Sequence, residues 1–256
     1  AEYVRVPFAD VGVFAVPDGI RDEQALFVSS SLPSAYSVVE SCAVRPGTVV
    51  AVWGCGALGQ FAVRSAQLLG ASRVIAIDRS SSRLQLATRA PGVEALGFGE
   101  VDDLTEVLRD LTGGRGPDVC IDAWSDGCGE LGARHRRSVR LASSEHDSQD
   151  VECSTIMRQM VRACRKGGTI ATVGVHAATI DAFPAAMMAH KDLTYRAGRG
   201  NPQRHAKMLL QCIAEGKIDP SVVVTRRLRL DEAASAFTAF KHTHGEHVAV
   251  VFVADK

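Results

Sequence analysis

The chain has 256 residues, 46 % of them hydrophobic, and its 29 basic and 29 acidic residues give a formal net charge of zero. This composition supplies a sizeable core and gives no sign of a nucleic-acid or membrane surface. No apolar run approaches the roughly 18 residues that span a bilayer, and the N-terminal residues lack the regions of a signal peptide. The length suits one large domain or up to two smaller ones.

The seven cysteines are odd in number, scattered, and never spaced as C-x-x-C. This usage is typical of a reduced, cytoplasmic protein and argues against a disulfide framework or a zinc knuckle. We therefore expect free thiols.

The most informative stretch begins with a short apolar run, residues 48–53, which predicts a strand buried on both faces. Gly54, Gly56 and Gly59 follow it with the spacing G-x-G-x-x-G. In this motif the first glycine makes a sharp turn, the second lets a pyrophosphate approach the backbone, and the third lets the helix pack on the strand. The N–H groups that begin the following helix would then point at the phosphates.

A second strand, residues 73–77, ends at Asp78, nineteen positions after Gly59. A carboxylate there can accept hydrogen bonds from the adenosine ribose and would repel a 2′-phosphate, which favours NAD. Arg79 follows directly and leaves NADP open. The alternative is a glycine turn in an α/β domain that binds no ligand, but strand, turn, helix, strand and acid all occur in register.

Strands and helices alternate along much of the remaining chain. Further strands are expected at residues 119–123, 169–175 and 193–197, with helices between them. This order predicts an α/β fold with a doubly wound parallel sheet. The expected domains are residues 1–28 as part of a second lobe, residues 29–197 as the nucleotide domain, and residues 198–256 as a return to the second lobe.

Residues 125–150 are the least regular section and are expected to form a surface excursion. Their basic cluster, residues 134–140, allows an anion or nucleic-acid patch, but flanking acids favour a solvated loop. Three histidines follow the last expected helix, namely His242, His244 and His247. Their spacing could bind a metal, although a polar loop is favoured. His176 could be a surrogate acid, although an ordinary loop histidine is favoured.

Seven segments share the pattern of one enzyme family: residues 1–7, 16–18, 52–56, 74–79, 112–122, 164–169 and 216–221. They resemble the medium-chain, zinc-type alcohol dehydrogenases, and within these the glutathione-independent formaldehyde dehydrogenase, or formaldehyde dismutase, branch. The resemblance extends along the chain except for about residues 124–150. It implies hydride transfer between NAD and a small alcohol or aldehyde, with a zinc ion polarising the substrate oxygen. It also implies that the second lobe is mostly β, of the GroES-like kind.

The zinc site departs from the family pattern. The resemblance implies that the N-terminal part of the catalytic lobe, with the first zinc ligands and the proton relay, would precede Ala1. It also implies an aspartate ligand where this sequence has Ser30. A neutral hydroxyl is a poor zinc ligand. Zinc is therefore expected for the family, but no metal ligand and no catalytic residue can be named in this chain.

The cofactor half matches the family better. The residues that the resemblance places against the dinucleotide are Gly54, Gly56, Ala57, Leu58, Gly59, Asp78, Arg83, Ala123, Val175 and Gly198. The first five would face the pyrophosphate, and Asp78 and Arg83 the adenosine ribose. Ala123 would lie on the adenine side, while Val175 and Gly198 would lie beside the nicotinamide. The strand at residues 193–197 matches one that pairs across a dimer, so a homo-oligomer is expected.

Two functions from different classes fit this pattern. One is an NAD-dependent oxidoreductase, of which the chain supplies the cofactor-binding part with an incomplete zinc site. The other is a catalytically inactive NAD-binding module that stands alone or pairs with another subunit. A zinc-free reductase is a third, weaker possibility.

Overall fold

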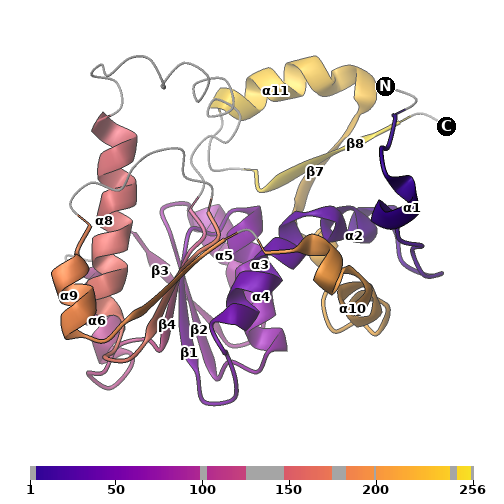
Figure 1. The fold of residues 1–256 in the computed structure, drawn as a ribbon. Coiled ribbons are helices and arrows are strands. Elements are labelled where there is room, and N and C mark those ends of the chain that lie inside the picture. The colour runs from indigo at the N-terminus through magenta and orange to yellow at the C-terminus, as the bar shows by residue number, and fades with distance from the viewer. Residues whose placement is uncertain are drawn as a thin grey trace.

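The computed structural model describes residues 4–98, 103–124, 147–174, 183–198, 200–242 and 247–254, without the side chains of residues 147–154 and 240–242. Its centre is a six-stranded sheet in which every neighbouring pair is parallel (Figure 1). The strand order is β3-β2-β1-β4-β5-β6. The strands are β1 Val49–Trp53, β2 Arg73–Asp78, β3 Val93–Gly97, β4 Val119–Asp122, β5 Thr169–Thr172 and β6 Thr194–Ala197.

This order reverses between β1 and β4, and in open parallel sheets ligands bind at the carboxyl ends of the strands on either side of such a reversal. The expected doubly wound parallel sheet is confirmed. The edge strand β3 was not expected from the sequence. Its residues, VEALG, contain one β-branched side chain and a central alanine, so they carry little strand propensity of their own. These residues form a strand because they pair with β2.

Helices cover both faces of the sheet. One face carries α3 Ser31–Ser41, α4 Ala57–Leu68, α5 Ser81–Thr88 and α10 Pro202–Ala214. The other carries α6 Leu104–Asp110, α8 Asp147–Ala163 and α9 Ala185–His190. Several helices begin at side-chain caps: the carboxylate of Asp103 accepts from Thr105 N at 2.8 Å, and the amide of Asn201 accepts from Gln203 N at 3.1 Å.

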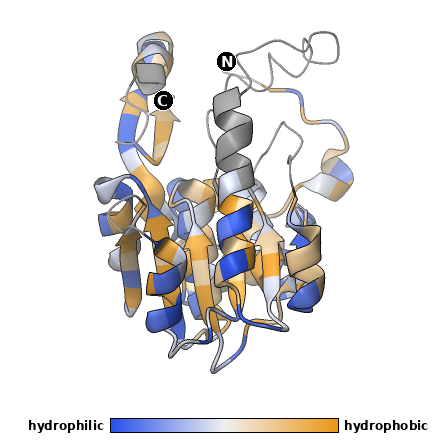
Figure 2. Cartoon of the chain, turned by 90° about the vertical axis from the view of Figure 1, so that its left-hand side faces the viewer, coloured by the Kyte–Doolittle hydropathy of each residue, from blue (hydrophilic) through white to orange (hydrophobic). Residues whose placement is uncertain are grey.

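The central strand β1 is buried on both sides, as its continuous apolar run predicts. Val50 and Val52 join the apolar cluster under α3, α4 and α10, whereas Ala51 and Trp53 join the cluster under α6 and α8. Figure 2 shows the apolar strands enclosed by helices whose polar residues face outward. The sheet therefore lies between two separate cores.

The chain outside residues 29–197 contributes to both a core and a second sheet. Helix α10 buries Leu209 and Leu210 in the same cluster as α3 and α4. A small parallel sheet of β7 Val224–Arg229 and β8 Ala249–Val253 lies at the upper end of Figure 1, with η3 Leu230–Glu232 and α11 Ala233–His242 between the two strands in the chain. The division of the chain into domains stays a prediction.

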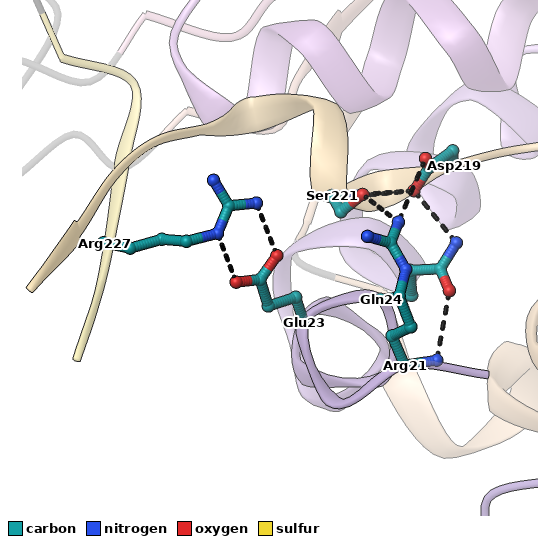
Figure 3. Close-up of polar contacts among 6 residues, drawn as sticks. All are labelled: Arg21, Glu23, Gln24, Asp219, Ser221 and Arg227. Carbon is teal, nitrogen blue, oxygen red and sulfur yellow. Dashed lines mark hydrogen bonds and ion pairs between the residues drawn. The ribbon is translucent and has the colours of Figure 1, made fainter. Parts of the chain in front are cut away.

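The N-terminal segment contacts strand β7 of this second sheet and the 3₁₀ helix that precedes it. It contains α1 Ala9–Gly12, α2 Asp22–Ala25 and η1 Leu26–Ser29, and it meets η2 Pro220–Val223 and β7. Arg227 donates two hydrogen bonds to the carboxylate of Glu23, at 2.5 and 2.6 Å, and Arg21 donates to Ser221 Oγ at 3.0 Å (Figure 3). The hydrogen bond from Arg227 lowers the pKa of Glu23. Exposed pairs of this kind contribute little free energy, so their main effect is to orient α2 against β7.

In the part of the chain that the structure describes, no helix has the length and apolar character needed to cross a membrane.

Leu209→Ala is expected to lower the free energy of unfolding by about 2–5 kcal/mol, because it removes buried methyl groups from a packed core. Leu209 is 0 % exposed in α10, whereas Leu230 is 40 % exposed in η3 and provides a matched control. Leu230→Ala is expected to change the unfolding free energy by less than about 0.5 kcal/mol. Urea denaturation measures both. Equal losses for the two variants would contradict the placement of α10 in the core.

Candidate cofactor-binding site

The glycine turn lies between β1 and α4, at the reversal of strand order. Gly54 has a φ of 87°, a conformation that glycine adopts without strain. A Cβ on Gly54 would lie 2.8 Å from Trp124 Cα, and a Cβ on Gly59 would lie 1.7 Å from the Gly54 carbonyl oxygen. A Cβ on Gly56 would meet nothing within 4 Å. Packing therefore requires Gly54 and Gly59, whereas the space in front of Gly56 is open.

The beginning of α4 faces this open space. Gly56, Ala57 and Leu58 are partly exposed, while Gly59 is buried against the turn. The first N–H groups of a helix have no acceptor within the helix, and Gly56, as the N-cap residue, has no side chain to supply one. Together with the positive end of the helix dipole, these N–H groups provide an anion-binding position.

Asp78 closes β2 beside the turn and is 1 % exposed. Its Oδ2 accepts a hydrogen bond from Cys55 N at 2.5 Å, and its Oδ1 accepts from Ser80 N at 2.8 Å. Each carboxylate oxygen has a second lone pair that can accept from a hydroxyl. The carboxylate is thus fixed by backbone N–H groups on both sides and is almost fully buried.

An aromatic pair lies beside this acid. The guanidinium carbon of Arg79 is 5.1 Å from the ring centroid of Phe98 and 5.4 Å from that of Trp124. Phe98 follows β3, Arg79 follows β2 and Trp124 lies just after β4, so the carboxyl ends of three strands of the sheet meet at one cluster. Cation–π contact of this kind holds Arg79 over the rings. We did not identify Phe98 or Trp124 from the sequence, although an aromatic residue directly after a strand of a parallel sheet was the available signal.

A buried glutamine lies behind the turn. Gln60 is 0 % exposed, and its Nε2 donates to the carbonyl oxygen of Cys55 at 3.0 Å and to that of Arg83 at 2.9 Å. Its Oε1 accepts from Arg64 Nη1 at 2.8 Å. Sequence reasoning missed this residue too; the signal was a polar side chain on the apolar face of the helix.

Most of the expected cofactor residues come together here. Arg83 lies in the first turn of α5, and its Nε is buried without a hydrogen-bond partner among the described residues. Ala123 is buried, and its N–H donates to Trp53 O at 2.8 Å, next to the glycine turn. Gly198 directly follows β6, three places from β1 in the sheet order. Val175 lies outside the described residues.

The described residues do not fit a zinc ion. Among them, no three His, Cys, Asp or Glu side chains form a group that could hold a metal. Ser30 is exposed at the junction of η1 and α3. Burial raises the pKa of the Cys55 thiol, which keeps it protonated and unsuited to a metal. His176 and His244 lie outside the described residues, as does the side chain of His242.

The cysteines agree with the expectation from composition. The five whose side chains are described are free thiols: Cys42, Cys55, Cys120, Cys164 and Cys212. The first four are buried, and burial raises the pKa of Cys42 to about 11.

Both the sequence and the fold of this chain are similar to those of known dehydrogenases. Residues 57–128 match the family model described as zinc-binding dehydrogenase. A zinc-type alcohol dehydrogenase-like protein of Schizosaccharomyces pombe is 31 % identical over 98 % of this chain and 57 % of its own length. A zinc-type alcohol dehydrogenase-like protein of Bacillus subtilis is also 31 % identical, over 98 % of this chain and 65 % of its own length.

Among solved structures, the alcohol dehydrogenase TADH from Thermus sp. ATN1 superimposes with a TM-score of 0.81 at 30 % identity, covering all of this chain and 65 % of the other. Proteins named glutathione-independent formaldehyde dehydrogenase are more distant, with 25 % identity for that of Bacillus subtilis. The chain spans 57 % to 65 % of the length of the relatives described above. Along nearly its whole length, then, it is similar in sequence and fold to the zinc-type alcohol dehydrogenase-like family.

Proposed function

We propose that this chain is the NAD-binding part of an oxidoreductase that transfers hydride between NAD and a small alcohol or aldehyde. The main support for this proposal is the open space in front of Gly56. The first turn of α4 borders this space, and the Asp78 carboxylate is fixed beside the turn by two backbone N–H groups. These features supply the two charges that a dinucleotide needs, a positive one for the diphosphate and a negative one for the ribose.

In this proposal the residues of the chain bind and orient the cofactor, while the nicotinamide ring supplies the hydride chemistry when NAD is bound. The N–H groups of residues 56–58 hold the diphosphate, and Asp78 accepts hydrogen bonds from the ribose hydroxyls. The aliphatic and backbone atoms of Ala123 border the adenine side. We assign no catalytic residue and no step through a metal ion, since the described residues do not form a metal site.

The proposed preference for NAD over NADP rests on two contacts. The negative charge of Asp78 is held in place from both sides and would face a 2′-phosphate. Arg79, which could favour that phosphate, is stacked over Phe98 and Trp124. The proposed substrate class is small alcohols and aldehydes rather than formaldehyde alone, because relatives named for formaldehyde share less identity than those named alcohol dehydrogenase-like.

The second candidate is an NAD-binding module without activity of its own. Ser30 at the expected ligand position favours it. A direct comparison separates the two candidates: NADH binding, zinc content and alcohol or aldehyde turnover are measured on the purified chain. Binding with turnover supports the oxidoreductase, whereas binding with neither zinc nor turnover supports the module. Absence of NADH binding contradicts both.

We further propose that the chain forms a homodimer through β6. This strand is at the edge of the sheet, all four of its residues are exposed, and Tyr195 packs against Phe183 beside it, with ring centroids 6.2 Å apart. Thr194 donates its N–H to Gly168 O at 3.0 Å, toward β5. Because alternate residues of a strand face opposite neighbours, the N–H of Tyr195 faces outward and is available to a second chain.

Asp78→Asn is expected to raise the dissociation constant of NADH about tenfold, because a charge-assisted hydrogen bond to the ribose is lost. The variant is also expected to lose preference for NADH over NADPH, because it no longer repels the 2′-phosphate. Fluorescence titrations with NADH and with NADPH measure the dissociation constant of NADH and the preference between the two cofactors. Asp122→Asn is the control, since Asp122 is a buried carboxylate at the end of β4 that accepts from Trp124 N at 3.0 Å. Unchanged affinity and preference in Asp78→Asn would contradict the ribose role.

Gly56→Ala is expected to fold normally and to bind NADH more weakly, because its Cβ would enter the space that the diphosphate occupies. Its φ of −64° suits alanine. Gly59→Ala is expected to lower the melting temperature instead, because its Cβ would overlap the Gly54 carbonyl oxygen. Thermal unfolding and NADH titration of both variants test this contrast. Tight NADH binding by Gly56→Ala would show that the diphosphate lies elsewhere.

Tyr195→Pro is expected to convert a dimer into a monomer, because proline removes one outward N–H donor from β6. Tyr195→Phe keeps that donor and the ring, and it is expected to remain dimeric. Light scattering after size-exclusion chromatography measures the mass of each. A monomeric wild-type chain, or a dimeric Tyr195→Pro variant, would refute pairing through this edge.

A further inference from the structure

Gln60 connects three segments that border the candidate cofactor site. Its Nε2 reaches the carbonyl oxygen of Cys55, in the glycine turn, at 3.0 Å, and that of Arg83, in α5, at 2.9 Å. Arg64, one helical turn further along α4, donates to Gln60 Oε1 at 2.8 Å and so fixes which way the amide faces. The side chain is 0 % exposed, so no water competes for these hydrogen bonds.

The contact with Cys55 determines the direction of the next N–H group. A trans peptide is planar, and its C=O and N–H point in opposite directions. No cis peptide occurs in the described residues. Because Gln60 holds the Cys55 carbonyl toward the protein interior, the N–H of Gly56 in the same peptide is directed away from it. Gly56 is partly exposed, and the space in front of it is open.

The preceding peptide is fixed as well. The N–H of Cys55 donates to Asp78 Oδ2 at 2.5 Å. Cys55 is therefore held by its N–H from β2 and by its carbonyl from Gln60, on both sides of one residue. The Arg83 carbonyl, which the same amide holds, belongs to the first turn of α5, which follows Asp78. One side chain thus couples the diphosphate position to the ribose position.

We propose that Gln60 is a positioning residue for the cofactor. By holding the Cys55 and Arg83 carbonyls, it aims the Gly56 N–H at the diphosphate and keeps the first turn of α5 beside the glycine turn. This inference rests on the proposed function, and it assigns to Gln60 an effect on diphosphate affinity rather than a contact with the ligand. A glutamine that only filled the core would affect stability and leave the direction of the Gly56 N–H unchanged.

The test uses the full chain, with ADP and NADH as probes. Gln60→Met keeps the length of the side chain and removes the amide, and it is expected to weaken ADP and NADH binding by a common factor of about tenfold, as expected for a lost hydrogen bond to a charged group. Gln67→Met is the matched control on the same helix, since Gln67 donates to Pro91 O at 2.5 Å away from the turn. The control is expected to bind both probes like the wild type.

A spectroscopic measurement separates positioning from stability. In two-dimensional ¹H–¹⁵N spectra, ADP is expected to shift the Gly56 amide proton downfield in the wild type and in Gln67→Met. It is expected to leave that proton unshifted in Gln60→Met. If Gln60→Met does not fold, Gln60→Glu replaces it, because the carboxylate keeps the pair with Arg64 but cannot donate to the two carbonyls.

The outcomes are distinct. Folded Gln60 variants that bind ADP within twofold of the wild type, or that keep the Gly56 shift, would overturn the positioning role and leave the proposed function intact. A wild-type chain that binds neither ADP nor NADH would overturn the proposed function itself.

Discussion

The close contact between Gly59 and the Gly54 carbonyl sets the angle at which α4 leaves β1, and the candidate site depends on it. With no side chain at either position, the helix begins directly above the end of the central strand. Its first N–H groups then lie at the carboxyl ends of the strands between which the strand order reverses. Asp78, from the neighbouring strand, accepts the Cys55 N–H and holds the turn in that position. Any side chain at residue 59 would separate these groups.

Much of this arrangement is readable from the sequence because it depends on local chemistry. The apolar run of β1, the three glycines and Asp78 specify strand, turn, helix and acid within about thirty residues. The contacts that the sequence did not reveal are formed between segments distant in the chain. Phe98, Trp124 and Arg79 meet because three strands end at one level, and Gln60 reaches α5 only once β2 lies beside β1. Strand β3 was missed for the same reason, since pairing with β2 rather than propensity makes it a strand.

The ends of the described chain connect the six-stranded sheet to the small sheet of β7 and β8. Helix α10 completes one core of the main sheet, and the chain then continues into β7 and β8. The Glu23–Arg227 pair joins the N-terminal segment to β7 across two hundred residues of sequence. The two places where the chain passes between these structures are therefore adjacent. The relatives that are similar to this chain along nearly its whole length are themselves longer.

The position of the diphosphate can be measured in a crystal structure of the chain soaked with NAD. We expect the diphosphate within hydrogen-bond distance of the backbone N–H groups of residues 56–58, with the adenosine ribose hydroxyls against the Asp78 carboxylate. A diphosphate bound elsewhere, or an empty turn in crystals saturated with NAD, would contradict it.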